Sequence, residues 1–144
     1  MILDEHRDKI RRYLVVAEGL RVKPYTDTSG KLTIGIGRNL TDVGITAMEA
    51  YDLLDHDIDR AITELVSRYS WFADQDPVRQ AAMVELEFNM GPESFGGFHN
   101  TLKAWREKDY PKVAAGLRES KWFKQVQPSR SARIIQMVEH GEWI

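Results

Sequence analysis

Apolar and polar positions repeat with a helical period along most of this chain, and with a strand period only in one short region near the N-terminus. The first helical stretch carries its apolar residues at the spacing of one helix face: Ile10, Tyr13, Leu14 and Ala17. This pattern predicts an amphipathic helix over about residues 4–18. Gly19 follows, at a position where helix C-termini favour glycine.

Two extended runs come next, over residues 22–26 and 31–36. The segment Asp27-Thr28-Ser29-Gly30 separates them and has the composition of a turn with glycine at its end. Together they predict a β-hairpin with a short loop.

The rest of the chain reads as helical. Thr46-Ala-Met-Glu49 is a capping box that predicts a helix through about Arg68. Asp76-Pro77 predicts the start of another helix, which ends at Gly91-Pro92. That helix is apolar nearly all round, so we expect it at the centre of the core, with Glu85 and Glu87 paired at the core edge. Further helices are predicted over residues 97–107, 110–120 and 129–140.

This order of elements predicts an α+β fold that is mainly helical and has two lobes. At 144 residues the chain is expected to form a single domain over residues 1–144. The small β-containing lobe spans about 20–45, a connecting helix spans about 46–68, and the helical lobe spans about 70–144 and includes the N-terminal helix.

Composition excludes several classes of function. With no cysteine there is no disulfide and no thiolate metal site, and we expect neither a metal nor a cofactor. The four histidines form no local ligand pair. The net charge is −2, with an acidic middle between two basic ends, which argues against a nucleic-acid partner. No apolar run is long enough to span a bilayer, and no signal peptide is visible at the N-terminus.

Three side chains near the hairpin suggest chemistry. Glu18 lies at the predicted helix end, where the helix dipole disfavours an ionised carboxylate and so suits an acid that gives up a proton. Asp27 begins a turn whose free N–H groups favour its ionised form. Thr33 lies on the returning strand, where its hydroxyl can hold a water beside Asp27. Hydrolysis of a glycosidic bond needs such a pair of carboxyl groups, although a helix end, a turn and a strand alone also explain these residues.

The same residues resemble the signature of the phage-type lysozymes, glycoside hydrolase family 24. The resemblance covers about residues 12–144, and its segments are Glu18-Gly-Leu-Arg21, Tyr25-Thr-Asp-Thr28, Thr33-Ile-Gly-Ile-Gly37, Phe88-Asn-Met-Gly91, Gly97-Phe-His-Asn-Thr-Leu102, Ser120-Lys-Trp-Phe123 and Pro128-Ser-Arg-Ser-Ala-Arg133. The resemblance implies a lysozyme-like fold with Glu18 as general acid, Asp27 as second catalytic carboxylate and Thr33 as the hydroxyl that positions water.

The resemblance also implies residues around the chemistry. The expected substrate-binding residues are Asn39, Phe88, Asn89 and Thr101. Arg130 is expected to approach Glu18 and support it. Where relatives have a histidine after the Ile-Gly-Ile-Gly segment, this chain has Arg38, and we expect Asp57 to be its ion-pair partner. Gly116 stands where a relative has a glycan-contacting asparagine.

The implied activity is hydrolysis of the bond between N-acetylmuramic acid and N-acetylglucosamine in bacterial peptidoglycan, without metal or cofactor. We expect a monomer that is made in a bacterial cytoplasm, has no stable membrane association, and reaches the cell wall with the help of another factor. Two alternatives stay open. A lytic transglycosylase cleaves the same bond without water, and an inactive wall-binding module has the same fold. A nucleic-acid binder using Arg130 and Arg133 is disfavoured by charge.

Overall fold

The computed structural model describes residues 2–144, and its contacts divide the chain into two units, one up to Asp52 and one from Leu53 onward. The first unit begins with two helices, α1 (Ile2–Glu5) and α2 (Arg7–Glu18), separated at His6. The predicted helix is therefore present but interrupted in its first turn. It ends at Glu18 as expected, and Gly19 has a positive φ of 75°.

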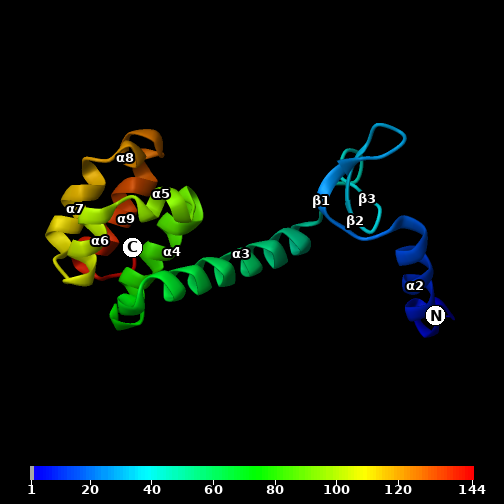
Figure 1. The fold of residues 1–144 in the computed structure, drawn as a ribbon, viewed down its shortest axis with the longest axis horizontal. Helices are drawn as coiled ribbons and strands as arrows, with labels where there is room; N and C mark the ends of the chain where they lie inside the picture. Colours follow the sequence, from blue (N-terminus) through cyan, green and yellow to red (C-terminus); the bar gives the residue numbers. More distant parts are fainter. Residues whose placement is uncertain (1) are drawn as a thin grey trace. The chain divides into compact units, whose positions relative to one another are not determined.

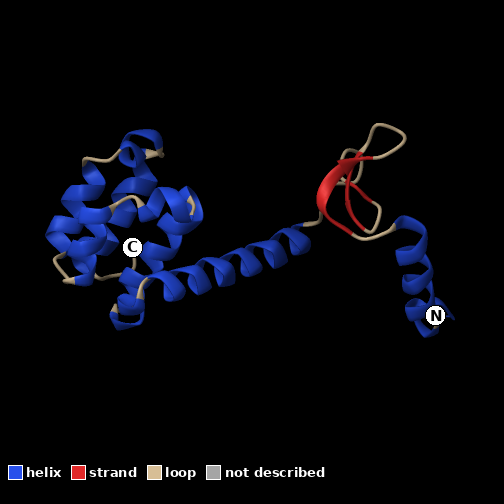
Figure 2. Cartoon of the chain, viewed as in Figure 1, coloured by secondary structure: helices blue, strands red, loops and turns tan. Residues whose placement is uncertain are grey.

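A three-stranded antiparallel sheet follows, with strands in the order β1 (Arg21–Thr26), β2 (Leu32–Gly35) and β3 (Arg38–Asn39) (Figure 2). The first two strands confirm the predicted hairpin. The pairing shifts register between Arg21 and Tyr25, where Pro24 has no N–H to give to a ladder. The sequence did not predict β3, because two residues are too short to show an alternating pattern.

Helix α3 (Ala47–Arg68) is the longest element and passes from the first unit into the second (Figure 1). Its capping box is formed as predicted. The Glu49 N–H donates to Thr46 Oγ1 at 3.1 Å, and Glu49 Oε2 accepts from the Thr46 N–H at 2.8 Å. These reciprocal bonds fix the point at which the chain leaves the sheet and becomes helical.

The second unit is helical throughout, and its helices after α3 gather into one bundle in Figure 1. After α3 its elements are η1 (Ser70–Asp74), α4 (Pro77–Met90), α5 (Pro92–Gly96), α6 (His99–Arg106), α7 (Tyr110–Arg118), α8 (Lys121–Gln125) and α9 (Pro128–His140). The four longer ones confirm the predicted helices, including the Asp76 cap of α4. The sequence missed η1, α5 and α8, each only five residues long.

The core of the second unit is a continuous cluster of buried apolar side chains, mostly from α4, α6, α7 and α9, with single residues from α3, η1, α5 and α8. Trp105 and Phe95 meet edge to face at its centre, with ring centroids 6.3 Å apart. The expectation of a central α4 is confirmed, since it contributes the fully buried Ala82, Met83 and Leu86. No helix in the described part of the chain combines the length and apolar character needed to cross a membrane.

Together the elements confirm an α+β fold that is mainly helical. The division at Asp52 leaves two earlier expectations as predictions: that residues 1–144 form one domain, and that the N-terminal helix belongs with the helical lobe.

Candidate active site

Glu18 ends α2, and its side chain lies against the backbone of Gly37 in the same unit. A Cβ atom added to Gly37 would lie 2.8 Å from Glu18 Oε2 and 2.9 Å from its Cδ. Gly37 also has a φ of 69°, a conformation that residues with a Cβ adopt only with strain. Glycine at this position therefore serves twice, by closing the β2–β3 turn and by leaving space for the Glu18 carboxyl group.

Asp27 follows β1 and organises the hairpin loop through one of its two carboxylate oxygens. Asp27 Oδ1 accepts from the N–H groups of Ser29 and Lys31, each at 2.8 Å. The Gly30 N–H donates to the Asp27 carbonyl at 3.0 Å, which completes the turn. Both backbone donors bind Oδ1. The other oxygen, Oδ2, has no hydrogen bond within the described residues.

Thr33 lies in the middle strand of the sheet, paired with Tyr25 on β1 and with Asn39 on β3. Its hydroxyl donates to the Lys31 carbonyl at 3.0 Å, and the Asp27 N–H donates to that same carbonyl at 2.9 Å. The hairpin therefore brings Asp27 and Thr33 together through one residue. Thr33 is 3% exposed, so its hydroxyl is held firmly rather than mobile in solvent.

Arg38 has a partner that the sequence analysis did not consider. Its guanidinium donates to both carboxylate oxygens of Glu49, at 2.6 and 2.7 Å, and to the Gly44 carbonyl at 3.1 Å. The Arg38 hydrogen bond, followed by the Thr46 N–H, lowers the pKa of Glu49 from 4.5 to about 2. The expected partner, Asp57, is ion-paired with Arg60 within the second unit at 2.5 Å. Arg38 and Asp57 each have another partner, Glu49 and Arg60, and an ion pair between them stays a prediction.

The four expected substrate-binding residues differ in how free they are. Asn39 is engaged locally, since its amide donates to Asp42 Oδ2 at 3.0 Å and its Oδ1 accepts from the Asp42 N–H at 2.9 Å. Thr101 is 8% exposed and packs against Gly116, where a side chain would collide with the Thr101 hydroxyl. Phe88 and Asn89 are exposed at the end of α4. The latter two are therefore the better placed to meet a ligand.

A hydrogen bond that the sequence analysis missed orients Asn89. The Trp122 indole N–H, which lies in α8, donates to Asn89 Oδ1 at 2.9 Å. Among the described residues the Asn89 NH₂ group donates no hydrogen bond, so it is available as a donor. Asn89 and Trp122 line one cavity of about 690 Å³. In the sequence Trp122 stood out only as part of the Ser120-Lys-Trp-Phe123 segment of the family resemblance.

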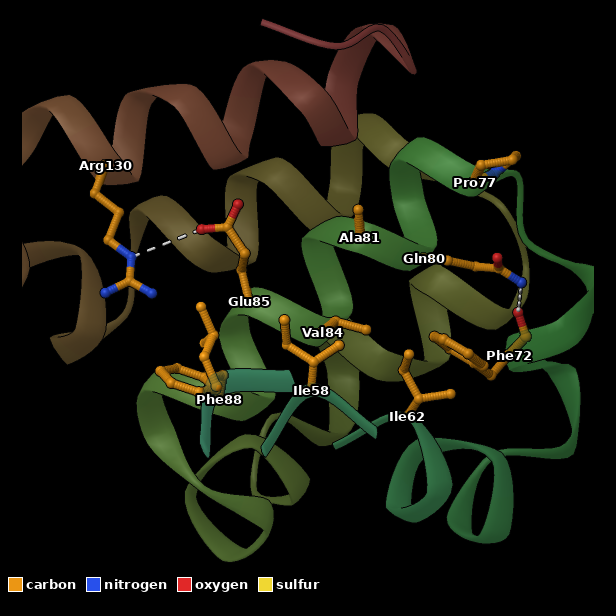
Figure 3. Close-up of a pocket in the computed structure, with 11 residues that line it drawn as sticks. Ile58, Ile62, Phe72, Pro77, Gln80, Ala81, Val84, Glu85, Phe88 and Arg130 are labelled. Atoms are coloured by element: carbon orange, nitrogen blue, oxygen red, sulfur yellow. Dashed lines mark hydrogen bonds and ion pairs between the residues drawn. The ribbon is translucent and has the colours of Figure 1, made fainter. Parts of the chain in front are cut away.

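Phe88 and Arg130 line a second cavity, of about 470 Å³ and largely apolar, which Figure 3 shows. At one end of this cavity Arg130 Nε lies 3.8 Å from Glu85 Oε2. Arg133 binds the same carboxylate with two hydrogen bonds, at 2.6 and 2.8 Å, and this contact lowers the pKa of Glu85. Arg130 thus has an anionic partner in its own unit, and its expected approach to Glu18 stays a prediction.

Glu87 has a different environment from Glu85, although both lie on α4. Its side chain is 1% exposed and is paired with Arg68. Burial, opposed by the Arg68 charge, raises the pKa of Glu87. Both glutamates thus confirm the expectation of partners at the core edge. Within residues 2–144, no group of three or more His, Cys, Asp or Glu side chains is arranged to hold a metal ion.

The first unit therefore presents two carboxyl groups in different settings and a fixed hydroxyl, all on one helix–hairpin segment. Within the described residues Glu18 forms no side-chain hydrogen bond and rests on a glycine, whereas Asp27 is held by two N–H donors. Hydrolysis of a glycosidic bond uses a proton donor and an ionised carboxylate. The site thus has the groups that a glycoside hydrolase requires.

Comparison with known proteins identifies the family. The family model for phage lysozyme matches residues 16–134, a range that includes Glu18, Asp27 and Thr33. A probable T4-type lysozyme 1 of Dictyostelium discoideum is 27% identical, over 92% of this chain and 94% of its own length. The peptidoglycan hydrolase gp36 of Pseudomonas phage phiKMV is 26% identical over 90% of this chain, which corresponds to 15% of its own length.

The chain is accordingly an enzyme of the glycoside hydrolase class. It belongs to the phage lysozyme family.

Proposed function

We propose that this enzyme hydrolyses the β-1,4 bond between N-acetylmuramic acid and N-acetylglucosamine in bacterial peptidoglycan. The observation that carries the proposal is the hairpin itself, where Lys31 links Asp27 to Thr33 and Gly37 of the same sheet makes room for Glu18. The family match and the names of the relatives, a probable T4-type lysozyme and a peptidoglycan hydrolase, support the choice of substrate.

Glu18 acts as the general acid in this proposal. Its carboxyl group gives a proton to the glycosidic oxygen as the bond to the leaving sugar breaks. Its place at the C-terminal end of α2, with its carboxyl group against Gly37, supports this role. Gly37 is a positioning residue, since only a residue without a Cβ leaves the Glu18 side chain where it lies.

Asp27 and Thr33 prepare the attacking water. Asp27 Oδ2 is free of backbone donors and accepts the proton that the water loses as its oxygen bonds to the anomeric carbon. The Thr33 hydroxyl donates a hydrogen bond to the Lys31 carbonyl. The lone pairs of the hydroxyl oxygen are therefore available to accept a hydrogen bond from that water. A water between the two carboxyl groups implies an inverting reaction, with a carboxyl separation of roughly 6.5–9.5 Å.

Phe88 and Asn89 are the proposed contacts of the helical unit with the glycan. Phe88, which is 49% exposed, offers a ring on which a sugar face can stack. Asn89 offers its NH₂ group as a donor, since its oxygen already accepts from Trp122. Asn39 and Thr101 stay proposals from the family resemblance, and their engaged or buried side chains make them weaker candidates. Arg130 and the pair of Arg38 with Asp57 are likewise proposed in supporting roles. We propose that the enzyme works as a monomer and needs no cofactor.

Product analysis tests this function directly. Purified peptidoglycan is digested in heavy-oxygen water with the wild-type enzyme and with Glu18→Gln, and the products are examined by mass spectrometry. The proposal expects labelled reducing ends from the wild type and none from the variant. Anhydro-sugar ends would instead establish a lytic transglycosylase, and no products from either protein would establish a wall-binding module.

A further inference from the structure

A small cavity on the helical unit has a composition unlike that of the two larger ones. Its volume is about 240 Å³, and its walls come from Tyr69 just after α3, from η1, from Gly96 at the end of α5 and from α6. Two aromatic side chains, Tyr69 and Trp71, form one side. Three basic side chains, His99, Lys103 and Arg106, lie on α6. The catalytic residues proposed above all belong to the other unit.

The aromatic side is rigid. The rings of Tyr69 and Trp71 lie 5.3 Å apart and are inclined at 41°, and both pack against the core behind them. The Arg68 guanidinium lies 5.3 Å from the Tyr69 ring. Arg68 is itself held by Glu87 and by the Pro92 carbonyl. A ligand that stacks on these rings would therefore meet a preformed surface.

The basic side is unpaired. His99, Lys103 and Arg106 are spaced four and three residues apart, which places them on one face of α6. Among residues 2–144, Lys103 and Arg106 form no ion pair and no side-chain hydrogen bond, whereas Arg38, Arg79, Arg118 and Arg133 all do. Two cations without partners beside fixed aromatic rings favour an anion that carries a flat or ring-shaped body.

We propose that this cavity binds an anionic sugar, with the pyranose ring on Trp71 and Tyr69 and its carboxylate or phosphate on Lys103 and Arg106. Its volume is below that of drug-sized pockets and suits a single sugar residue. The choice of a saccharide rests on the proposed function, because the enzyme then works on a polymer that carries acidic sugars. The cavity would hold the enzyme on the wall between cuts.

Nuclear magnetic resonance of the full chain tests this site through the Trp71 indole signal, assigned with Trp71→Phe. Three probes are titrated separately. N-acetylglucosaminyl-N-acetylmuramic acid carries a carboxylate and lacks the bond that the enzyme cuts. N,N′-diacetylchitobiose (chitobiose below) is its neutral counterpart with the same two N-acetylated rings. N-acetylglucosamine 1-phosphate carries a phosphate. The two acidic probes distinguish a carboxylate ligand from a phosphate ligand.

We expect at least one acidic probe to shift the Trp71 signal with an affinity about five-fold or more above that of chitobiose. The affinity of that probe should fall as salt is added. Lys103→Ala and Arg106→Ala should each weaken binding about five-fold. Lys112→Ala, an exposed lysine elsewhere in the unit, should leave it unchanged. Equal affinity for chitobiose, no shift of the Trp71 signal, or unchanged binding by the Lys103→Ala/Arg106→Ala double variant would overturn the proposal.

A second variant tests the cavity without changing charge. Gly96 lines the cavity and has ordinary contacts, with Arg68 Nη1 and Tyr69 Oη each 3.6 Å from an added Cβ. A Cβ is therefore tolerated at this position, and Gly96→Leu extends a side chain from it into the cavity. Its unfolding midpoint is measured first; in the folded variant the shift should be lost, and retained binding would contradict the site. Cleavage of soluble glycan by these variants should stay at the wild-type level. A failure of this proposal is thus distinct from a failure of the proposed hydrolysis.

Discussion

The helical unit buries a continuous apolar cluster, whereas the unit before it, taken by itself, buries one described residue, Thr33. In the helical unit the positions of side chains follow from packing of residues such as Leu86, Trp105 and Leu117, all fully buried. In the first unit they follow from hydrogen bonds and backbone conformation. Side chains are thus held by apolar packing in the helical unit and by hydrogen bonds in the first unit.

The hydrogen bonds of the first unit each hold a particular part of the backbone. Asp27 closes the hairpin loop, Thr46 and Glu49 cap α3, and Arg38 clamps Glu49 to the loop after β3. Each of these contacts fixes a geometry but contributes modestly to stability. The proposed chemistry lies in this unit. Changes there should therefore affect activity more than stability, and changes in the helical core should do the reverse.

The largest expected effect is on activity, from Asp27→Asn. The amide oxygen can still accept the Ser29 and Lys31 N–H groups, so the hairpin should persist. The group at the Oδ2 position can no longer take a proton from water. We expect the rate of peptidoglycan cleavage to fall by about 10²- to 10⁴-fold with the unfolding midpoint unchanged. A variant as active as the wild type would remove Asp27 from the mechanism.

Leu117→Ala should show the opposite behaviour. Leu117 is fully buried in α7, and its truncation should lower the free energy of unfolding by about 2–5 kcal/mol in urea titration. The cleavage rate of the folded variant should stay near the wild-type rate. Val66→Ala, at an exposed apolar position of α3, is the control and should change stability by less than about 0.5 kcal/mol. Equal losses in both variants would mean that the helical core does not carry the stability.

Gly37→Ala and Gly35→Ala form a matched pair. Both residues have a φ near 70°, so alanine strains the backbone equally, by about 1–2 kcal/mol. Only at Gly37 does the new Cβ collide with Glu18, since nothing lies within 4 Å at Gly35. We expect both variants to lose similar stability, and only Gly37→Ala to lose a further 10- to 100-fold or so in cleavage rate. Equal rates would show that Gly37 does not position Glu18.

The smallest effect concerns pH. Because the folded-state pKa of Glu49 is lowered to about 2, the stability that its contacts contribute is complete above its ordinary value of 4.5. That contribution is lost as the pH falls from 4.5 to 2. In Arg38→Met the Glu49 pKa, followed by carboxylate chemical shift, should return toward 4.5. Arg38→Lys retains the charge but not the two-point contact, so its Glu49 pKa should lie between those of the wild type and Arg38→Met. Identical Glu49 titrations in the wild type and both variants would exclude the Arg38–Glu49 pair.

The sequence predicted elements that have a long period or a distinct cap, such as α3, α4 and α9. It could not predict η1, α5 and α8, because a single turn shows no periodicity. The catalytic candidates were available from residue types and spacing. The contact of Gly37 with Glu18 was not, since it depends on a positive φ and on how a helix end meets a turn. The partner of Arg38 had a signal, because a capping box already fixes where the Glu49 carboxylate lies.

The central claim is that the chemistry resides in the first unit and depends on Glu18 as proton donor. The most direct test measures the rate of peptidoglycan cleavage and the unfolding midpoint together for the wild type and Glu18→Gln. The amide keeps the shape of the side chain beside Gly37 but has no acidic proton to give. We expect a rate lower by about 10²- to 10⁴-fold with an unchanged midpoint. An unchanged rate in the folded variant would contradict it.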